Sequence, residues 1–139
     1  MTGYLLDTNV VSELRKRERA ATSVLTWFDA HTSADLWLSV LTIGELRRGA
    51  LLVARRDAAA GQAIGSWLES VIADFGDRLL PVSTPIVERW ARLNVPDPVP
   101  VVDGLLAATA LEHDLALVTR NAQDVASTGA VLVNPFEES

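Results

Sequence analysis

Four acidic residues of the chain could together hold a divalent metal ion, because each lies beside an apolar run. Asp7 follows residues 4–6, Glu45 lies past residues 36–40, Asp103 follows residues 99–102, and Asp124 lies past residues 115–118. An unpaired carboxylate in apolar surroundings is costly, so one shared cation accounts economically for all four. Carboxylate oxygens suit Mg²⁺ or Mn²⁺, which also bind phosphate oxygens and can activate water. The set therefore predicts metal-assisted phosphodiester hydrolysis.

Other reaction classes lack their residues. The chain has no cysteine, which excludes disulfides, thiol nucleophiles and thiolate metal sites. Ser12 and Ser39 have no histidine close by in the sequence, so a hydrolytic triad is not supported. A phosphatase of the haloacid dehalogenase type, with Asp7 as nucleophile, would need a second aspartate where Asn9 stands and a downstream lysine. The only lysine is Lys16, and a receiver domain fails for the same reason.

The overall charge disfavours a protein that holds nucleic acid through bulk positive charge. The formal net charge is −6, and a strongly basic surface is the usual signature of such binding. The basic residues are nearly all arginine, however, and the planar guanidinium binds phosphate bidentately. A nucleic-acid substrate therefore remains open.

Length and patterning predict one α/β domain over residues 1–139. The chain is 49% apolar, which is enough for a sizeable core. Short apolar strands separated by amphipathic helices predict a mainly parallel sheet of roughly five strands. The expected strands are 5–6, 36–40, 79–82, 115–119 and 131–133, and the expected helices are 10–19, 23–30, 42–52, 57–75, 86–93 and 103–113.

The acidic residues should converge, because sites in parallel sheets form beyond the carboxyl ends of the strands. Each acid also has a purely structural interpretation. Asp7 could cap the first helix, although Asn9 is the expected N-cap. Glu45 could pair with Arg48 one turn later, Asp103 could be an N-terminal helix acid, and Asp124 could be a turn residue.

The sequence also indicates a compartment. The N-terminus begins in strand-like sequence with no basic leader, and no apolar run approaches the roughly 18–20 residues that span a bilayer. We therefore expect a soluble cytoplasmic protein with no membrane contact.

Four blocks of sequence resemble the PIN-domain ribonucleases, in order and with the expected spacing. The chain is most similar to the VapC/FitB branch, the toxins of type II toxin–antitoxin pairs. The resemblance covers essentially the whole chain, including the closing residues 131–136. The blocks are Leu5-Leu6-Asp7-Thr8-Asn9-Val10-Val11-Ser12-Glu13, Leu38 to Gly49 with Gly44-Glu45-Leu46-Arg47-Arg48, Val102-Asp103-Gly104-Leu105-Leu106-Ala107-Ala108-Thr109-Ala110, and Leu117-Val118-Thr119-Arg120-Asn121.

This resemblance implies a three-layer α/β/α fold and a Mg²⁺-dependent endoribonuclease, with Mn²⁺ as an alternative ion. The implied metal ligands are Asp7 and Asp103, with Glu45 as the third acid. The resemblance also implies a homodimer silenced by a VapB-like antitoxin in a higher assembly. Residues that support or line the pocket in relatives match Thr8, Asn9 and Thr119 here.

The fourth acidic position departs from the family pattern. Relatives carry the acid directly after Thr-Arg or three residues later, and here these positions hold Asn121 and Asp124. Val125 stands where an aromatic residue is common, and Phe136 stands where tryptophan is common. An alternative reading is a catalytically weak PIN-like module that mainly binds RNA or its antitoxin.

Overall fold

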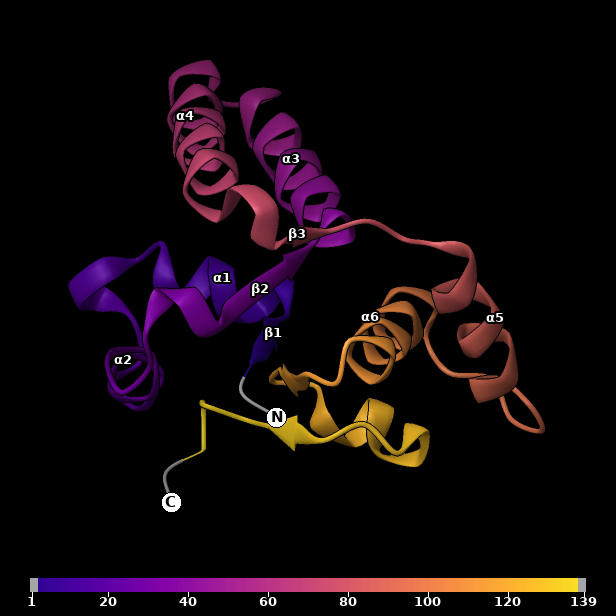
Figure 1. The fold of residues 1–139 in the computed structure, drawn as a ribbon. Helices are drawn as coiled ribbons and strands as arrows, with labels where there is room; N and C mark the ends of the chain where they lie inside the picture. Colours follow the sequence, from indigo (N-terminus) through magenta and orange to yellow (C-terminus); the bar gives the residue numbers. More distant parts are fainter. Residues whose placement is uncertain (1–2, 138–139) are drawn as a thin grey trace.

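Five short parallel strands form one sheet with helices on both faces in a computed structural model that describes residues 3–137 (Figure 1). The strand order is β3-β2-β1-β4-β5, and every neighbouring pair is parallel. The α/β prediction with a parallel five-stranded sheet is confirmed. The strands are β1 (Tyr4–Leu6), β2 (Leu36–Ser39), β3 (Leu79–Leu80), β4 (Ala116–Val118) and β5 (Leu132–Val133).

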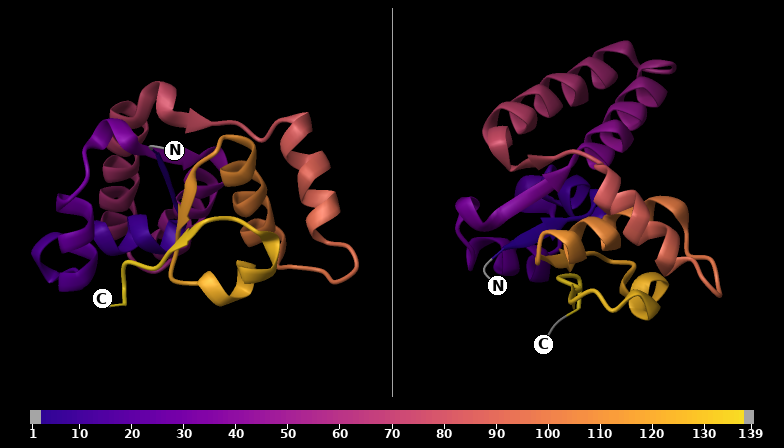
Figure 2. Two further views of the ribbon diagram at one scale, coloured as in Figure 1. Left: turned by 60° about the horizontal axis from the view of Figure 1, so that its bottom comes forward. Right: turned by 45° about the vertical axis from the view of Figure 1, so that its right-hand side comes forward.

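The helices form the two outer layers. Helices α5 and α6 lie together on one side of the strands, and α3 and α4 pack along each other and extend away from the sheet (Figure 2). Among residues 3–137, no helix is both long and apolar enough to cross a bilayer. The helices are α1 (Thr8–Leu14), α2 (Thr22–Asp29), α3 (Val40–Ala54), α4 (Ala58–Phe75), α5 (Thr84–Leu93) and α6 (Val101–Glu112), with short 3-10 helices at Arg17–Arg19, Ser33–Asp35, Gly76–Arg78 and Ala122–Thr128.

Two apolar cores sandwich the sheet, because successive side chains of a strand point to opposite faces. Leu5 belongs to one core with Leu106 of α6. Leu6 belongs to the other core with Val10 of α1 and Leu68 of α4. Burial on both faces explains why the strands are continuously apolar rather than alternating.

The first helix begins and ends earlier than its sequence predicts. The N-cap is Asp7 and not Asn9, since Asp7 has an extended backbone and its side chain accepts a hydrogen bond from the Thr8 backbone. The helix ends at Leu14 and not at Arg19. Arg17 has a φ of 55°, a left-handed conformation that an α-helix cannot continue through.

Three further boundaries shift near the acidic residues. Strand β2 stops at Ser39, whose hydroxyl caps α3, so this helix starts at Val40 and not at Thr42. Helix α6 starts at Val101, which places Asp103 inside its first turn rather than at its start. Asp124 lies in the 3-10 helix Ala122–Thr128 and not in a simple turn. The shift at Ser39 comes from a local cap, because its hydroxyl accepts a hydrogen bond from the Leu41 backbone.

Helices α3 and α4 approach each other closely at Gly61, which is buried. A Cβ atom placed there would lie 2.4 Å from Ala54 Cβ and 2.7 Å from the Ala54 backbone nitrogen. Gly44 of α3 offers a contrast, because a Cβ atom there would meet nothing within 4 Å. The spacing of the two helices therefore depends on the absence of a side chain at residue 61.

We expect Gly61→Ala to lower the free energy of unfolding by about 1–3 kcal/mol, because backbone atoms cannot yield to the added methyl group. The matched Gly44→Ala change should raise it by about 0.5–1 kcal/mol through reduced chain entropy. Urea denaturation followed by circular dichroism measures both values. Equal stability of the two variants would contradict this account of the contact between α3 and α4.

Candidate active site

Asp7 lies where the central strand β1 ends, and it is held by the neighbouring strand β4. Its Oδ1 accepts a hydrogen bond of 2.6 Å from the Thr8 backbone, and its Oδ2 accepts one of 2.7 Å from the Thr119 hydroxyl. Asp7 is 5% exposed and Thr119 is 1% exposed. The expected supporting role of Thr119 therefore has a concrete contact, which fixes the orientation of the Asp7 carboxylate.

Asn9 connects the first helix to the segment that follows β4. Its side-chain amide donates to Asp7 Oδ2 at 3.3 Å, and its Oδ1 accepts from the Arg120 backbone at 3.2 Å. Asn9 therefore acts as a bridge between the ends of two adjacent strands rather than as a helix cap. This bridge holds Asp7 and Thr119 in register at the carboxyl edge of the sheet.

Glu45 reaches the same edge from α3. Its Oε1 accepts a hydrogen bond of 2.5 Å from the Thr8 hydroxyl. The same Thr8 hydroxyl also lies 3.4 Å from the hydroxyl of buried Thr42. Within residues 3–137, the ion pairs of the structure do not join Glu45 to Arg48. The sequence interpretation missed Thr42, although a threonine one turn before Glu45 on the same helix face was the available signal.

Asp103 points into this region from the first turn of α6. The helix is tightly packed here, since a Cβ atom on Gly104 would be 2.6 Å from Val99 Cγ2 in the preceding loop and 3.2 Å from Trp90 Cδ1 of α5. Burial raises the pKa of the Asp103 carboxyl, and the negative charges of Asp7, Asp124 and Glu45 raise it further. The other three acids are thus close enough to repel Asp103 electrostatically.

Asp124 and Asn121 contribute to the site in different ways. The Asn121 backbone donates to the Thr119 hydroxyl at 2.9 Å, which supports the residue that orients Asp7. Asp124 is exposed on the 3-10 helix, and its charge acts on Asp103. The unusual Val125 fills the core with 1% exposure, and Phe136 lies under the Arg120 guanidinium at 3.8 Å from the ring centroid.

The donor set suits a hydrated divalent cation. Across residues 3–137, no three acidic or histidine side chains converge tightly enough to enclose an ion by themselves. Mg²⁺ commonly uses only one or two carboxylates and keeps several water ligands. Carboxylates whose charges act on one another fit such an ion, whose charge would offset their repulsion.

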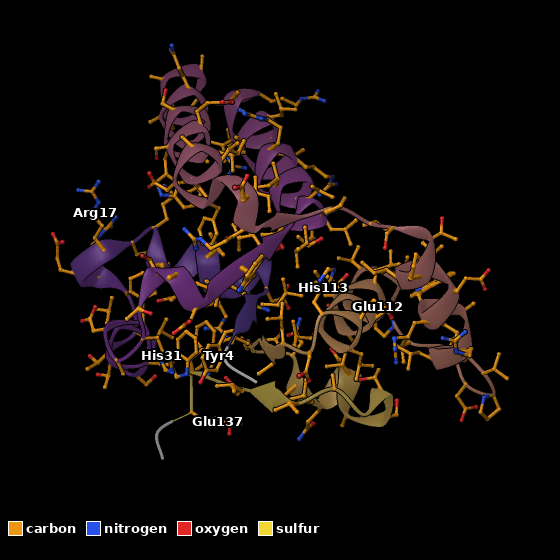
Figure 3. All side chains as sticks on the ribbon, in the orientation of Figure 1. Tyr4, Arg17, His31, Glu112, His113 and Glu137 are labelled. Carbon is orange, nitrogen blue, oxygen red and sulfur yellow. The ribbon has the colours of Figure 1, made fainter. Side chains whose placement is uncertain are left out.

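The aromatic residues around Tyr4 lie at the opposite end of β1 from Asp7. The His31 ring is 4.6 Å from the Tyr4 ring and stacks on Trp27 at 4.3 Å, and Figure 3 shows Tyr4 and His31 away from His113. The His31 Nδ1 lies 2.6 Å from the Trp27 carbonyl oxygen. This cluster packs α2 against the sheet and has no contact with the acids.

Comparison with known proteins identifies the family. Residues 4–128 match the sequence model of the PIN domain. The chain belongs to the PIN-domain family. It is 30% identical to the toxin FitB of Neisseria gonorrhoeae, over 96% of this chain and 99% of FitB. It is 33% identical to the VapC ribonuclease Y4jK of Sinorhizobium fredii, over 96% of this chain and 97% of that protein.

Solved structures show the same PIN fold. A chain of the FitAcB crystal structure from Neisseria gonorrhoeae superposes with a TM-score of 0.88 at 30% identity, covering 97% of this chain and 99% of that one. A chain of a toxin–antitoxin complex from Klebsiella pneumoniae superposes with a TM-score of 0.71 at 26% identity, covering 98% and 100%. The three-layer α/β/α expectation for this PIN domain is confirmed.

The repulsion around Asp103 predicts that Asp103→Asn stabilises the metal-free protein at neutral pH. A carboxyl whose pKa is raised by folding costs stability when ionised, and the cost fades as pH falls through the raised pKa. The stability gain of the variant should therefore shrink from neutral pH toward the ordinary aspartate value of 3.8. Thermal melts in chelator at several pH values measure the difference.

Asp77→Asn provides the control, because Asp77 is an exposed carboxylate in the 3-10 helix that follows α4. This variant should show no comparable gain at neutral pH. A loss of stability in Asp103→Asn at neutral pH would show that the Asp103 charge is favourably compensated in the fold.

Proposed function

We propose that this PIN-domain protein is the toxin of a VapBC-type pair and hydrolyses RNA as a Mg²⁺- or Mn²⁺-dependent endoribonuclease. The observation that supports the proposal is that Asp7, Asp124 and Glu45 lie near enough to Asp103 for their charges to raise its pKa. Similarity to a VapC ribonuclease and to the toxin FitB over nearly the whole chain supports it. The substrate is RNA and the bond broken is a backbone phosphodiester.

In this proposal Asp7 and Asp103 hold the ion directly, while Glu45 and Asp124 reach it directly or through water. Asp7 has the better fixed carboxylate, because hydrogen bonds from Thr8 and Thr119 set its plane. When bound, the ion would polarise the phosphate, neutralise developing charge and favour ionisation of water. The carboxylates supply the negative charge that makes the ion bind.

In this proposal the same hydrogen bonds give the hydroxyl residues a positioning role. Thr119 presents Asp7 Oδ2, and Thr8 presents Glu45 Oε1, so both carboxylates are oriented before substrate arrives. The exposed Glu45 keeps Oε2 available to accept a proton from a water that attacks the phosphate opposite the leaving oxygen. Preorientation of this kind removes reorganisation from the reaction step.

The proposed partners follow from the relatives and from the charge of the chain. The Klebsiella pneumoniae neighbour comes from a toxin–antitoxin complex, and we propose a VapB-like antitoxin for this chain. A net charge of −6 and an acidic pocket would favour a basic antitoxin segment at the site. We further propose a homodimer, a larger assembly with the antitoxin, and action in the cytoplasm.

Asp7→Asn and Asp103→Asn should each abolish Mg²⁺-dependent RNA cleavage and growth arrest while the fold persists. Loss of one direct ligand leaves the ion too weakly held, and we expect at least about a 100-fold loss, in line with losses seen even for residues that only orient ligands. Cleavage of total RNA in a Mg²⁺ and Mn²⁺ titration measures it, with circular dichroism as the fold control. Full activity in either variant would refute the assignment.

The same titration distinguishes the proposed nuclease from the catalytically weak alternative. A module that only binds RNA or antitoxin would leave RNA intact at every Mg²⁺ and Mn²⁺ concentration, in the native chain as well as in the variants. Asn121 at the position of a family acid is the feature that favours this alternative.

The fourth acidic position is tested by comparing Asp124→Asn with Asn121→Ala. The Asp124 charge acts on Asp103, whereas Asn121 supports Thr119 through its backbone, which the alanine change preserves. We expect Asp124→Asn to weaken activity or Mg²⁺ affinity by about 10–100-fold, as for residues that act through ligands or water. Asn121→Ala should stay near the native rate. The reverse order of effects would assign the position to Asn121.

A further inference from the structure

A groove leads away from the acidic residues, and its lining beyond Thr8 and Glu45 takes no part in the proposed chemistry. It has a volume of about 220 Å³ and starts at Thr8 and Glu45. Small and aliphatic side chains of α3 and α4 line its middle, and its far end is formed by Arg15 and Trp67. The groove therefore connects the carboxylate site to one cation and one large aromatic ring.

Arg15 and Trp67 are only loosely associated. The Arg15 guanidinium carbon lies over the Trp67 ring at 5.9 Å from its centroid, near the outer limit of a cation–π contact. Arg15 is exposed, while Trp67 is half-buried and packs against the core that contains Leu68. A flat ligand can thus find an aromatic surface anchored by the core, with an exposed cation beside it.

The charge around the groove changes sign along α1. Asp7 precedes this seven-residue helix, which rises about 10 Å, and a basic loop of residues 15–19 follows it. Lys16 of the loop is paired with Glu13 at 2.9 Å, and Arg17 points away from the molecule (Figure 3). Arg15 is the cation of this loop that lines the groove.

We propose that this groove is a subsite for a nucleotide that flanks the scissile bond of single-stranded RNA, with its base on Trp67 and its phosphate at Arg15. The proposal rests on the nuclease function above and adds a determinant of substrate binding. A base can reach an aromatic side chain in this way only when it is unpaired and unstacked. The cation at the far end favours a phosphate over a basic antitoxin segment as the occupant.

The test uses the full chain with Mg²⁺ and short single-stranded RNA of random sequence. Trp67→Leu keeps apolar volume on the core side but removes the stacking surface, so KM should rise about tenfold with little change in kcat. Trp67→Phe keeps an aromatic ring and should stay close to the native KM. Thermal melts of all variants establish that the compared proteins are folded.

The charge arm of the test compares Arg15→Gln with Arg56→Gln. Arg15→Gln should raise KM and reduce the salt dependence of binding by about 0.7 in the log–log slope, the value for one phosphate contact on a single strand. Arg56 is exposed on the connection between α3 and α4, outside the groove, and its replacement should change neither quantity.

The outcomes distinguish failure of the subsite from failure of the function. The subsite would be overturned if Trp67→Leu and Arg15→Gln kept the native KM and the native salt dependence. If Asp103→Asn still lost cleavage in the same experiment, the nuclease function would remain supported. Weakened binding of the antitoxin alone would assign the groove to the peptide and also overturn the subsite. If the native chain cleaves no RNA, anisotropy measures the binding of the same RNA instead. The subsite then predicts weaker binding by Trp67→Leu and Arg15→Gln and unchanged binding by Trp67→Phe and Arg56→Gln. If Trp67→Leu does not fold, the comparison of KM and salt dependence between Arg15→Gln and Arg56→Gln decides whether the subsite exists.

Discussion

Repulsion among four carboxylates at one edge of the sheet is the constraint on which the site depends. The effect of this repulsion is visible at Asp103, because burial and the charges of Asp7, Asp124 and Glu45 all raise its pKa. A fold tolerates such an arrangement only where something offsets the charge or where the cost serves an activity. The rest of the domain holds these groups close enough for the three neighbouring charges to act on Asp103.

The parallel sheet achieves this by bringing distant segments to one edge. Strands β2, β1 and β4 are neighbours, so the residues that follow them meet although they are far apart in the chain. Hydrogen bonds then fix the individual groups, with Thr119 on Asp7 and Thr8 on Glu45. Asn9 ties the ends of β1 and β4 together through Asp7 and the Arg120 backbone. The apolar cores on both faces keep this edge in place.

The distribution of charge explains how an acidic protein could still accept RNA. A net charge of −6 repels a polyanion at long range, but local fields near the proposed divalent ion and near a basic loop would differ from the average. Residues 15–19 place cations at one end of α1, while the carboxylates lie at the other end. The groove between Glu45 and Arg15 spans these two regions.

The sequence by itself determined the class of fold and supplied the candidate acids of the site. Apolar runs of strand length, helical periodicity and an oxygen-only set of acids are local properties, and they predicted the parallel sheet and the four carboxylates. The local pattern could not choose the N-cap of the first helix between Asp7 and Asn9, because both residue types cap helices equally well. It also gave no sign of the left-handed Arg17 that ends the first helix.

Only the tertiary structure decided which strands are neighbours and what each carboxylate contacts. The links from Thr119 to Asp7 and from Thr8 to Glu45 span 112 and 37 residues of chain, beyond the range of any sequence period. The raised pKa of Asp103 likewise comes from burial and from charges on other elements. Such distances in space are set by packing of the whole chain, and no short stretch of sequence contains them.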